Sequence, residues 1–227
     1  MNRDFFVNIV FLVLVNVLIK PFYIFGIDRN VQNLVGGEAY GTYFSLTSLS
    51  ISLMVLNDMG IQNYNTREIA QNPQQLSRFF PNMIVLRSIL GVVYLITLEL
   101  IGFLIGYTWF ELQMLFFTGV IQILTTTINY QKGNIAGLGK YWLNSIVTVL
   151  DRFLLIIICG VLLWLPSFRA QFTIHWFIYA QVLTLLLALC IAFFFTFSDI
   201  KNIKFGFDPI FLRKILRGSF PFAISLF

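Results

Sequence analysis

The sequence predicts an all-α protein, a polytopic bundle of transmembrane helices with six spans and the start of a seventh. Of its 227 residues, 58% are hydrophobic and only 11% are charged, whereas a soluble domain carries about 25% charged residues. The mean hydropathy is +0.83. The apolar runs are continuous and do not alternate with polar residues, so helices are favoured over a β-barrel.

Each predicted span is an apolar run close to the length of about 20 residues that crosses a hydrocarbon core of about 30 Å. The seven runs are Phe5–Ile27, Tyr40–Met59, Pro81–Tyr107, Leu112–Tyr130, Tyr141–Leu165, Ile174–Phe197 and Ser219–Phe227. We expect residues 1–218 to form a six-helix lobe. Residues 219–227 are expected to be the truncated start of a seventh helix, which makes the sequence a fragment of a longer protein.

The second span has glycine signals at both ends. The glycine-rich stretch from Gly36 to Gly41 predicts the turn that enters it, and Gly60 is well placed as its C-cap. A polar loop that carries Arg67 and Glu68 is expected to follow Gly60.

Two further inner connections are predicted. After Asn72 and Pro73, the helical spacing of Leu76, Phe79 and Phe80 predicts a short interfacial helix that leads into the third span. The glycines between positions 133 and 139 predict a flexible loop after the fourth span. They follow a span rather than a strand, so a nucleotide-binding fingerprint is not supported.

The distribution of Lys and Arg predicts a cytoplasmic N-terminus, because cytoplasmic loops are enriched in these residues. With the N-terminus inside, the outer loops hold only Arg29 and Arg169. The inner segments hold the basic residues Arg3, Arg67, Arg78, Lys132, Lys140, Lys201, Lys204, Arg213, Lys214 and Arg217. The net charge of +5 therefore reflects topology and attraction to anionic lipid headgroups, and we expect no nucleic-acid partner.

Ionisable side chains inside the spans are the best candidates for function, since each costs about 2.5–3.5 kcal/mol at the centre of a helix. Asp151 and Arg152 lie nearest the midplane, about 15–17 Å beyond the inner start of the fifth span at about 1.5 Å per residue. Lys20 and Arg87 come next. Asp58 lies nearer a membrane surface, as does Glu99. Adjacent residues on a helix point about 100° apart, so Asp151 and Arg152 need not pair with each other.

Several spans also carry a polar stripe at helical spacing, as helices around a wet cavity would. Asn16 and Lys20 share a face of the first span. The other stripes are Ser45, Ser48 and Ser52; Gln122, Thr125, Thr126 and Asn129; and Asn144, Thr148 and Asp151. For Ser and Thr, hydrogen bonds between helices and close packing by small residues are the more economical explanation. For the charges at the midplane, a polar cavity is the better one.

The cations at depth predict an anionic ligand. An amphiphile with a phosphate or pyrophosphate head suits them, because Arg matches phosphate bidentately and Lys acts as a point charge. The sequence shows no catalytic triad, paired-carboxylate motif or metal cluster, so neither an enzyme nor a cofactor or metal site is expected.

Three stretches resemble the bacterial polysaccharide flippases, Wzx-like exporters of the multidrug/oligosaccharidyl-lipid/polysaccharide (MOP) superfamily. They are NVLIKPFYIFGIDRNVQNLV from Asn16 to Val35, then GGEAYGTYF, then NDMGIQNYNTREIA. The short run Gly137–Tyr141 and Arg152 in the fifth span echo the pattern. The resemblance implies that the chain is the N-terminal lobe of an exporter in which two six-helix lobes face each other across a cavity.

The resemblance also implies a function. Such proteins move lipid-linked oligosaccharides, typically on undecaprenyl pyrophosphate, across the bacterial inner membrane for surface polysaccharides such as O-antigen, by alternating access. It implies that Arg152, Lys20 and Arg87 receive the pyrophosphate, beside Asp151 and Asn16. Asp58, Arg67 and Glu68 become candidates for a gate or for coupling, and could equally be structural caps. Expected partners are the lipid-linked substrate, membrane lipids, the missing C-terminal lobe, a polysaccharide polymerase and glycosyltransferases.

Two alternatives stay open at this stage. A cation-coupled multidrug exporter of the same superfamily should present acids rather than Arg at depth. A membrane glycosyltransferase or acyltransferase should show a cluster of histidines or acids at one membrane face, and the sequence, whose single histidine is His175, shows none.

Overall fold

The computed structural model describes residue 13, residues 15–197 and residues 209–224. These residues form helices joined by short turns, with no strand among them. The elements are η1 (Phe22–Asp28), α2 (Arg29–Val35), α3 (Gly37–Ser52), α4 (Met54–Asp58), α5 (Ile61–Gln71), η2 (Pro73–Gln75), α6 (Leu76–Ile105), α7 (Trp109–Gly137), α8 (Tyr141–Trp164), α9 (Pro166–Arg169), α10 (Ile174–Phe197) and α11 (Pro209–Ile224). Residues 15–21 are helical as well and continue into η1.

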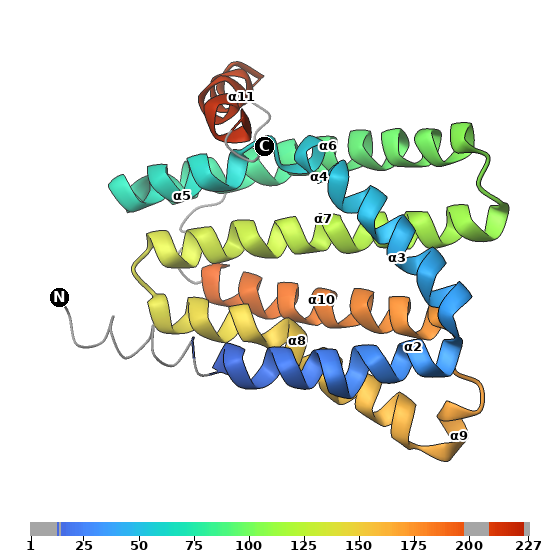
Figure 1. Ribbon diagram of the computed structural model, residues 1–227. Coiled ribbons are helices and arrows are strands. Elements are labelled where there is room, and N and C mark those ends of the chain that lie inside the picture. Colours follow the sequence, from blue (N-terminus) through green and yellow to red (C-terminus); the bar gives the residue numbers. More distant parts are fainter. Residues whose placement is uncertain (1–12, 14, 198–208, 225–227) are drawn as a thin grey trace.

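Helix α7 is the centre of the bundle (Figure 1). It packs against α3, α5, α6, α8 and α10. Its side chains fit this place, since small and apolar residues such as Gly119, Met114 and Leu115 are fully or nearly fully enclosed. Helix α6 lies on one side of α7, and α8 with α10 on the other. The long helices run roughly parallel or antiparallel, as expected of a membrane bundle.

The helix lengths agree with a membrane protein of several spans. Among the described residues, four helices are long and apolar enough to cross a membrane, and a fifth crossing arises if the bent pair α3 and α4–α5 counts as one span. The first predicted span, Phe5–Ile27, lies partly outside the described residues. Of the basic residues used to predict the orientation, Arg3, Lys201 and Lys204 also lie outside them. The cytoplasmic side of the bundle therefore remains a prediction.

The second span is broken in two places. The chain turns into α3 through a single residue, Gly36, whose φ of 88° and ψ of 159° are essentially restricted to glycine. The turn is therefore tighter than the predicted stretch Gly36–Gly41, most of which is helical. At the other end, Met59 and Gly60 are both left-handed, with φ of 46° and 72°. The 45° bend of the span lies earlier, at Leu53, between Gly37–Ser52 and the arm Met54–Gln71.

Three predictions about the inner connections are wrong. Arg67 and Glu68 lie in helix α5 and not in a loop. Leu76, Phe79 and Phe80 belong to the continuous 30-residue helix α6 and are buried, because α5, α11 and Tyr130 cover them. The chain between Gly133 and Gly137 is the last turn of α7. Its glycines let α5 approach closely, since a Cβ on either would press on Thr66 or Ile69.

Helix α11 begins at Pro209, so it runs through the boundary expected at residues 218/219. It crosses the bundle at one end and packs on α5 and α6 (Figure 1). The contact is closest at Gly60, where an added Cβ would stand 2.5 Å from the backbone nitrogen of Ala223 and the carbonyl oxygen of Ser219. The left-handed glycine therefore serves both the break and this helix contact.

Candidate functional site

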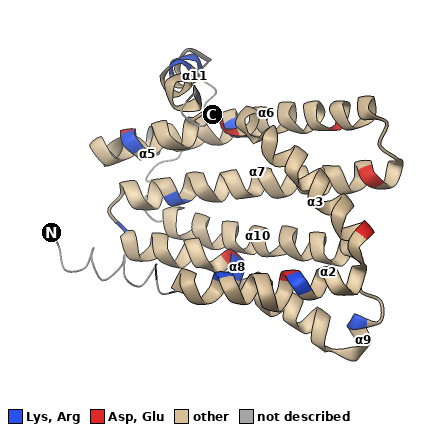
Figure 2. Ribbon diagram, in the orientation of Figure 1, with Lys and Arg blue, Asp and Glu red and all other residues tan. Residues whose placement is uncertain are grey.

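Arg152 lies in the apolar helix α8, and its side chain is 47% exposed. Besides Asp151, no other charged residue occurs in this 24-residue helix. Placing a lone guanidinium in hydrocarbon is costly. The Arg152 guanidinium is nevertheless not enclosed by the other helices and lies at the surface of the bundle. Figure 2 shows that Lys, Arg, Asp and Glu occur at few places along the ribbon.

Two side chains contact the Arg152 guanidinium. Its Nε lies 3.9 Å from Oδ2 of Asp151, so the adjacent residues do pair, although loosely. Its Cζ stands 4.7 Å from the centre of the Tyr23 ring, within the range of a cation–π interaction. A half-exposed pair at this distance contributes at most about 1 kcal/mol. The Arg152 charge is therefore only partly compensated.

A small pocket of about 70 Å³ lies beside the two residues. Its lining residues come from α7, α8 and α10: Ile121, Thr125, Asp151, Arg152, Leu155, Gln181, Thr184 and Leu185. Gln181 is fixed by a hydrogen bond with the Tyr43 hydroxyl. The volume suits a few water molecules or one small polar group, so the pocket cannot enclose a sugar chain.

The other two predicted cavity residues lie on the helix that precedes η1. Lys20 is exposed and Asn16 is half-buried. Tyr23 belongs to the same continuous helix, which contacts α8 through η1. Lys20 and Arg152 are thus exposed cations on neighbouring helices.

Arg87 has a different setting. Its Nη1 donates to Oδ1 of Asp58 over 3.1 Å, and the two side chains are only 5% and 10% exposed. Its Cζ also lies 5.4 Å from the centre of the Tyr130 ring. Helix α7 separates α6, which carries Arg87, from α8, which carries Arg152 (Figure 1). The structure therefore joins Arg87 to the gate candidate Asp58 and not to Asp151.

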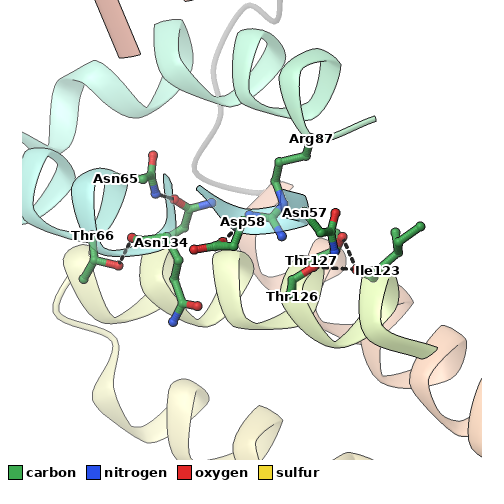
Figure 3. A network of polar contacts seen from close by, with 10 residues as sticks. Asn57, Asp58, Asn65, Thr66, Arg87, Ile123, Thr126, Thr127 and Asn134 are labelled. Carbon is green, nitrogen blue, oxygen red and sulfur yellow. Dashed lines mark hydrogen bonds and ion pairs between the residues drawn. The ribbon is translucent and has the colours of Figure 1, made fainter. Parts of the chain in front are cut away.

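Amide side chains extend this buried polar region along α7 (Figure 3). Asn57 Nδ2 donates to Thr126 Oγ1 over 2.7 Å, and Asn65 Nδ2 donates to Asn134 Oδ1 over 2.6 Å. Arg87 Nε and Nη2 are buried without a hydrogen-bond partner among the described residues. The broken second span is thus tied to α6 and α7 by polar contacts on both sides of the break.

The remaining predicted gate residues are peripheral. Arg67 is exposed and Glu68 is half-buried on α5. The expected hydrogen bond between helices is confirmed at Thr126, whereas Ser48 and Ser52 bond to carbonyls of their own helix. Among the described residues, no group of three or more His, Cys, Asp or Glu could hold a metal ion.

Sequence reasoning missed Tyr23, Gln181 and Thr184. Tyr23 lies 129 positions before Arg152, and no periodicity relates the two. Its position just after Lys20 and Pro21 was the one available signal. Gln181 and Thr184, three residues apart in the sixth span, could have been found as a polar pair on one helix face.

Comparison with known proteins supports the fold. No protein-family model matches the sequence, and no curated protein sequence matches it either. Solved structures match the chain in their three-dimensional fold. A crystal structure of a point mutant of a MATE protein superposes with a TM-score of 0.68 at 17% identity, covering 97% of this chain and 52% of that one.

Two further solved structures superpose on this chain about equally well. One is a MOP superfamily transporter from Pyrococcus furiosus, described as having a binding pocket of reversed polarity, with a TM-score of 0.67 at 18% identity. The other is a multidrug resistance MATE family transporter in an outward-facing conformation, also at 0.67 and 18%. Each covers 96% of this chain and 51% of the solved chain.

These likenesses establish that the chain has the fold of one lobe of a MATE-like protein, as the sequence predicted. The chain spans about half the length of the structures that it matches. At such low identity the agreement concerns the fold.

Proposed function

We propose that this chain is the N-terminal lobe of a membrane transporter that moves a lipid-linked anionic substrate, as a Wzx-like flippase does with undecaprenyl-pyrophosphate oligosaccharides. The protein would act in the bacterial inner membrane with its N-terminus in the cytoplasm. Its partners would be the lipid-linked oligosaccharide, membrane lipids, a second lobe, and the polymerase and glycosyltransferases of polysaccharide synthesis.

The observation that carries the proposal is the half-exposed Arg152 guanidinium in the middle of the apolar helix α8. A cation at such a depth marks a substrate pathway by default. Lys20, exposed on a neighbouring helix, adds a second positive charge. Together they favour a ligand with phosphate oxygens.

Two acids inside the predicted spans, Asp58 and Asp151, support the same conclusion. Asp58 is paired with Arg87 and largely buried. Asp151 is 26% exposed and lies next to Arg152. A site for organic cations would need a carboxylate without a cationic neighbour at depth, and neither acid meets that condition. Because Arg87 is already paired with a carboxylate, we remove it from the proposed pyrophosphate site. The proposed site then consists of Arg152 and Lys20, with Asp151 and Asn16 beside them.

The pocket of about 70 Å³ is far smaller than a sugar chain. This lobe would therefore supply a charged anchor for the head group, and the remainder of the transport cavity would come from a second lobe. Alternating access would then carry the anchored head group from one side to the other.

The test is export of surface polysaccharide by the full-length protein in a bacterial strain that lacks its own flippase. Arg152→Gln should abolish export at an unchanged amount of membrane-inserted protein, and Arg169→Gln, outside the site, should leave it intact. Normal export by the Arg152→Gln variant would refute the assignment of the site.

A multidrug exporter is the second candidate, favoured by the described function of one structure with the same fold. Expression of the full-length protein in a drug-sensitive strain separates the two. Raised resistance to organic cations without any change in polysaccharide export would establish this alternative.

A further inference from the structure

We infer that Tyr23 is a positioning residue for Arg152, and that Tyr23 and Asp151 together present the terminal edge of the guanidinium to a phosphate group. The Arg152 Cζ lies over the Tyr23 ring, 4.7 Å from its centre. Asp151 lies on the Nε side at 3.9 Å. The edge with the two terminal nitrogens has no protein partner among the described residues. The identity of the anion rests on the proposed function; the positioning of Arg152 does not.

An unusual helix places Tyr23. Residues Phe22–Asp28 form a π-helix, and Arg29 N–H bonds to the Ile24 carbonyl five residues back. Pro21 directly precedes it and cannot donate the usual helical hydrogen bond. Wide turns of this kind are rare and occur frequently at functional sites.

The wide turn changes which residues face the bundle. Ile27 and Val31 are fully buried, and Tyr23 packs against the same core. These three positions are spaced by four residues. In an ordinary α-helix, with about 3.6 residues per turn, residues at this spacing rotate gradually around the helix axis. The larger number of residues in a π-turn offsets this rotation, so the three side chains stay on one face. Tyr23 is therefore held by the core while its ring face meets Arg152.

The chemistry of the uncovered edge defines the ligand class. Two parallel N–H groups of an arginine match two oxygens of a phosphate or diphosphate ester. An aromatic platform restricts the rotation of the guanidinium without using any of its donors. A rigid, pre-oriented arginine loses less conformational entropy when the ligand binds.

The positioning can be tested without any ligand. Phenylglyoxal reacts with the terminal nitrogens of arginine, and mass spectrometry of the purified full-length protein measures its rate at Arg152. Tyr23→Leu should raise that rate about two- to fivefold, the range that an exposed cation–π contact supports. Tyr23→Phe keeps the ring and should react like the wild type.

Tyr179→Leu is the matched control, since Tyr179 of α10 packs on Phe117 of α7 and should not alter the rate at Arg152. If Tyr23→Leu does not fold, Tyr23→Trp replaces it. Trp is the strongest cation–π partner, so it should slow the modification. An unchanged rate in both Tyr23→Leu and Tyr23→Trp, or equal effects of Phe and Leu, would overturn the inference.

Binding of farnesyl diphosphate in detergent, with farnesol as the uncharged comparison, tests the ligand class. Tyr23→Leu should weaken the binding of the diphosphate about two- to fivefold, and Tyr23→Phe should not. If the wild type binds neither compound while the phenylglyoxal result holds, the proposed substrate fails and the positioning role of Tyr23 stands. If the diphosphate binds equally well to wild type and Tyr23→Leu, the positioning role fails and the proposed function stands.

Discussion

Arg87 Nη1 and Asp58 Oδ1 lie 3.1 Å apart and join two helices at the point where the second span breaks. Asp58 directly precedes Met59 and Gly60, the two left-handed residues of the break. The side chains are about nine-tenths enclosed or more. The pair therefore fixes the geometry of the break from the side of α6, while α11 contacts Gly60 from another side.

Removing Asp58 should destabilise the protein strongly. Asp58→Ala would leave the Arg87 charge buried and unpaired, at a cost of about 3–5 kcal/mol. Thermal unfolding in detergent measures this as a lower Tm. Glu38→Ala removes an exposed carboxylate and should change little. The decrease in Tm caused by Asp58→Ala should be smaller in an Arg87→Leu background, because no charge is then left unpaired. A Tm of Asp58→Ala equal to that of the wild type would contradict the pairing.

Gly60→Ala should loosen helix α11. The added Cβ would meet the α11 backbone at 2.5 Å, and the φ of 72° is itself unfavourable for alanine. We expect faster cleavage by trypsin after the exposed residues Arg213, Lys214 and Arg217 of α11, measured by gel electrophoresis. The control is Gly41→Ala, a helical position with nothing within 4 Å, which should be neutral or stabilising by about 1 kcal/mol. Equal proteolysis of the two variants would argue against the close contact.

Asn57 and Thr126 should be energetically coupled. Their hydrogen bond of 2.7 Å links α4 to α7 inside the bundle, where such bonds contribute about 0.6 kcal/mol on average and up to about 1.7. A double-mutant cycle with Asn57→Ala and Thr126→Val, read by unfolding in detergent, should give a coupling in this range. Ser48 bonds only to its own helix, so the cycle of Ser48→Ala with Thr126→Val should give none. The interpretation fails if the two cycles agree.

The predicted orientation can be tested by cysteine labelling. In a background in which Cys159 and Cys190 are replaced by serine, Gln171→Cys should react with an impermeant maleimide added outside intact cells. Gln74→Cys should react only after the membrane is opened. Both positions are exposed and lie in connections on opposite sides of the predicted topology. The reverse labelling pattern would invert the topology.

Much of the fold followed from the sequence, because a long apolar run in lipid must satisfy its backbone internally and therefore becomes a helix. Runs such as Tyr141–Leu165 and Ile174–Phe197 accordingly match α8 and α10 closely. The polar connections were harder. The stretch around Arg67 looked like a loop because it is polar, yet it forms α5, whose buried face, Ile61, Asn65 and Ile69, packs on α7.

For the candidate site, Arg152 could be found from the sequence, since an arginine in an apolar helix stands out by its cost. Its neighbour Tyr23 could not, because tyrosine is common in membrane helices and a ring face carries no pattern. Arg87 and Asp58 were each found as charges inside the spans, but their pairing could not be predicted, because they are 29 residues apart on separate helices.

The sequence by itself determined that the chain is a bundle of apolar helices, and it located the fifth and sixth spans to within about a residue. These properties depend on the solvent that each residue meets along its own helix. The tertiary structure decided which charges pair and which remain available, since that depends on distances between helices. It tied Arg87 to Asp58 and left the terminal edge of Arg152 open beside Tyr23.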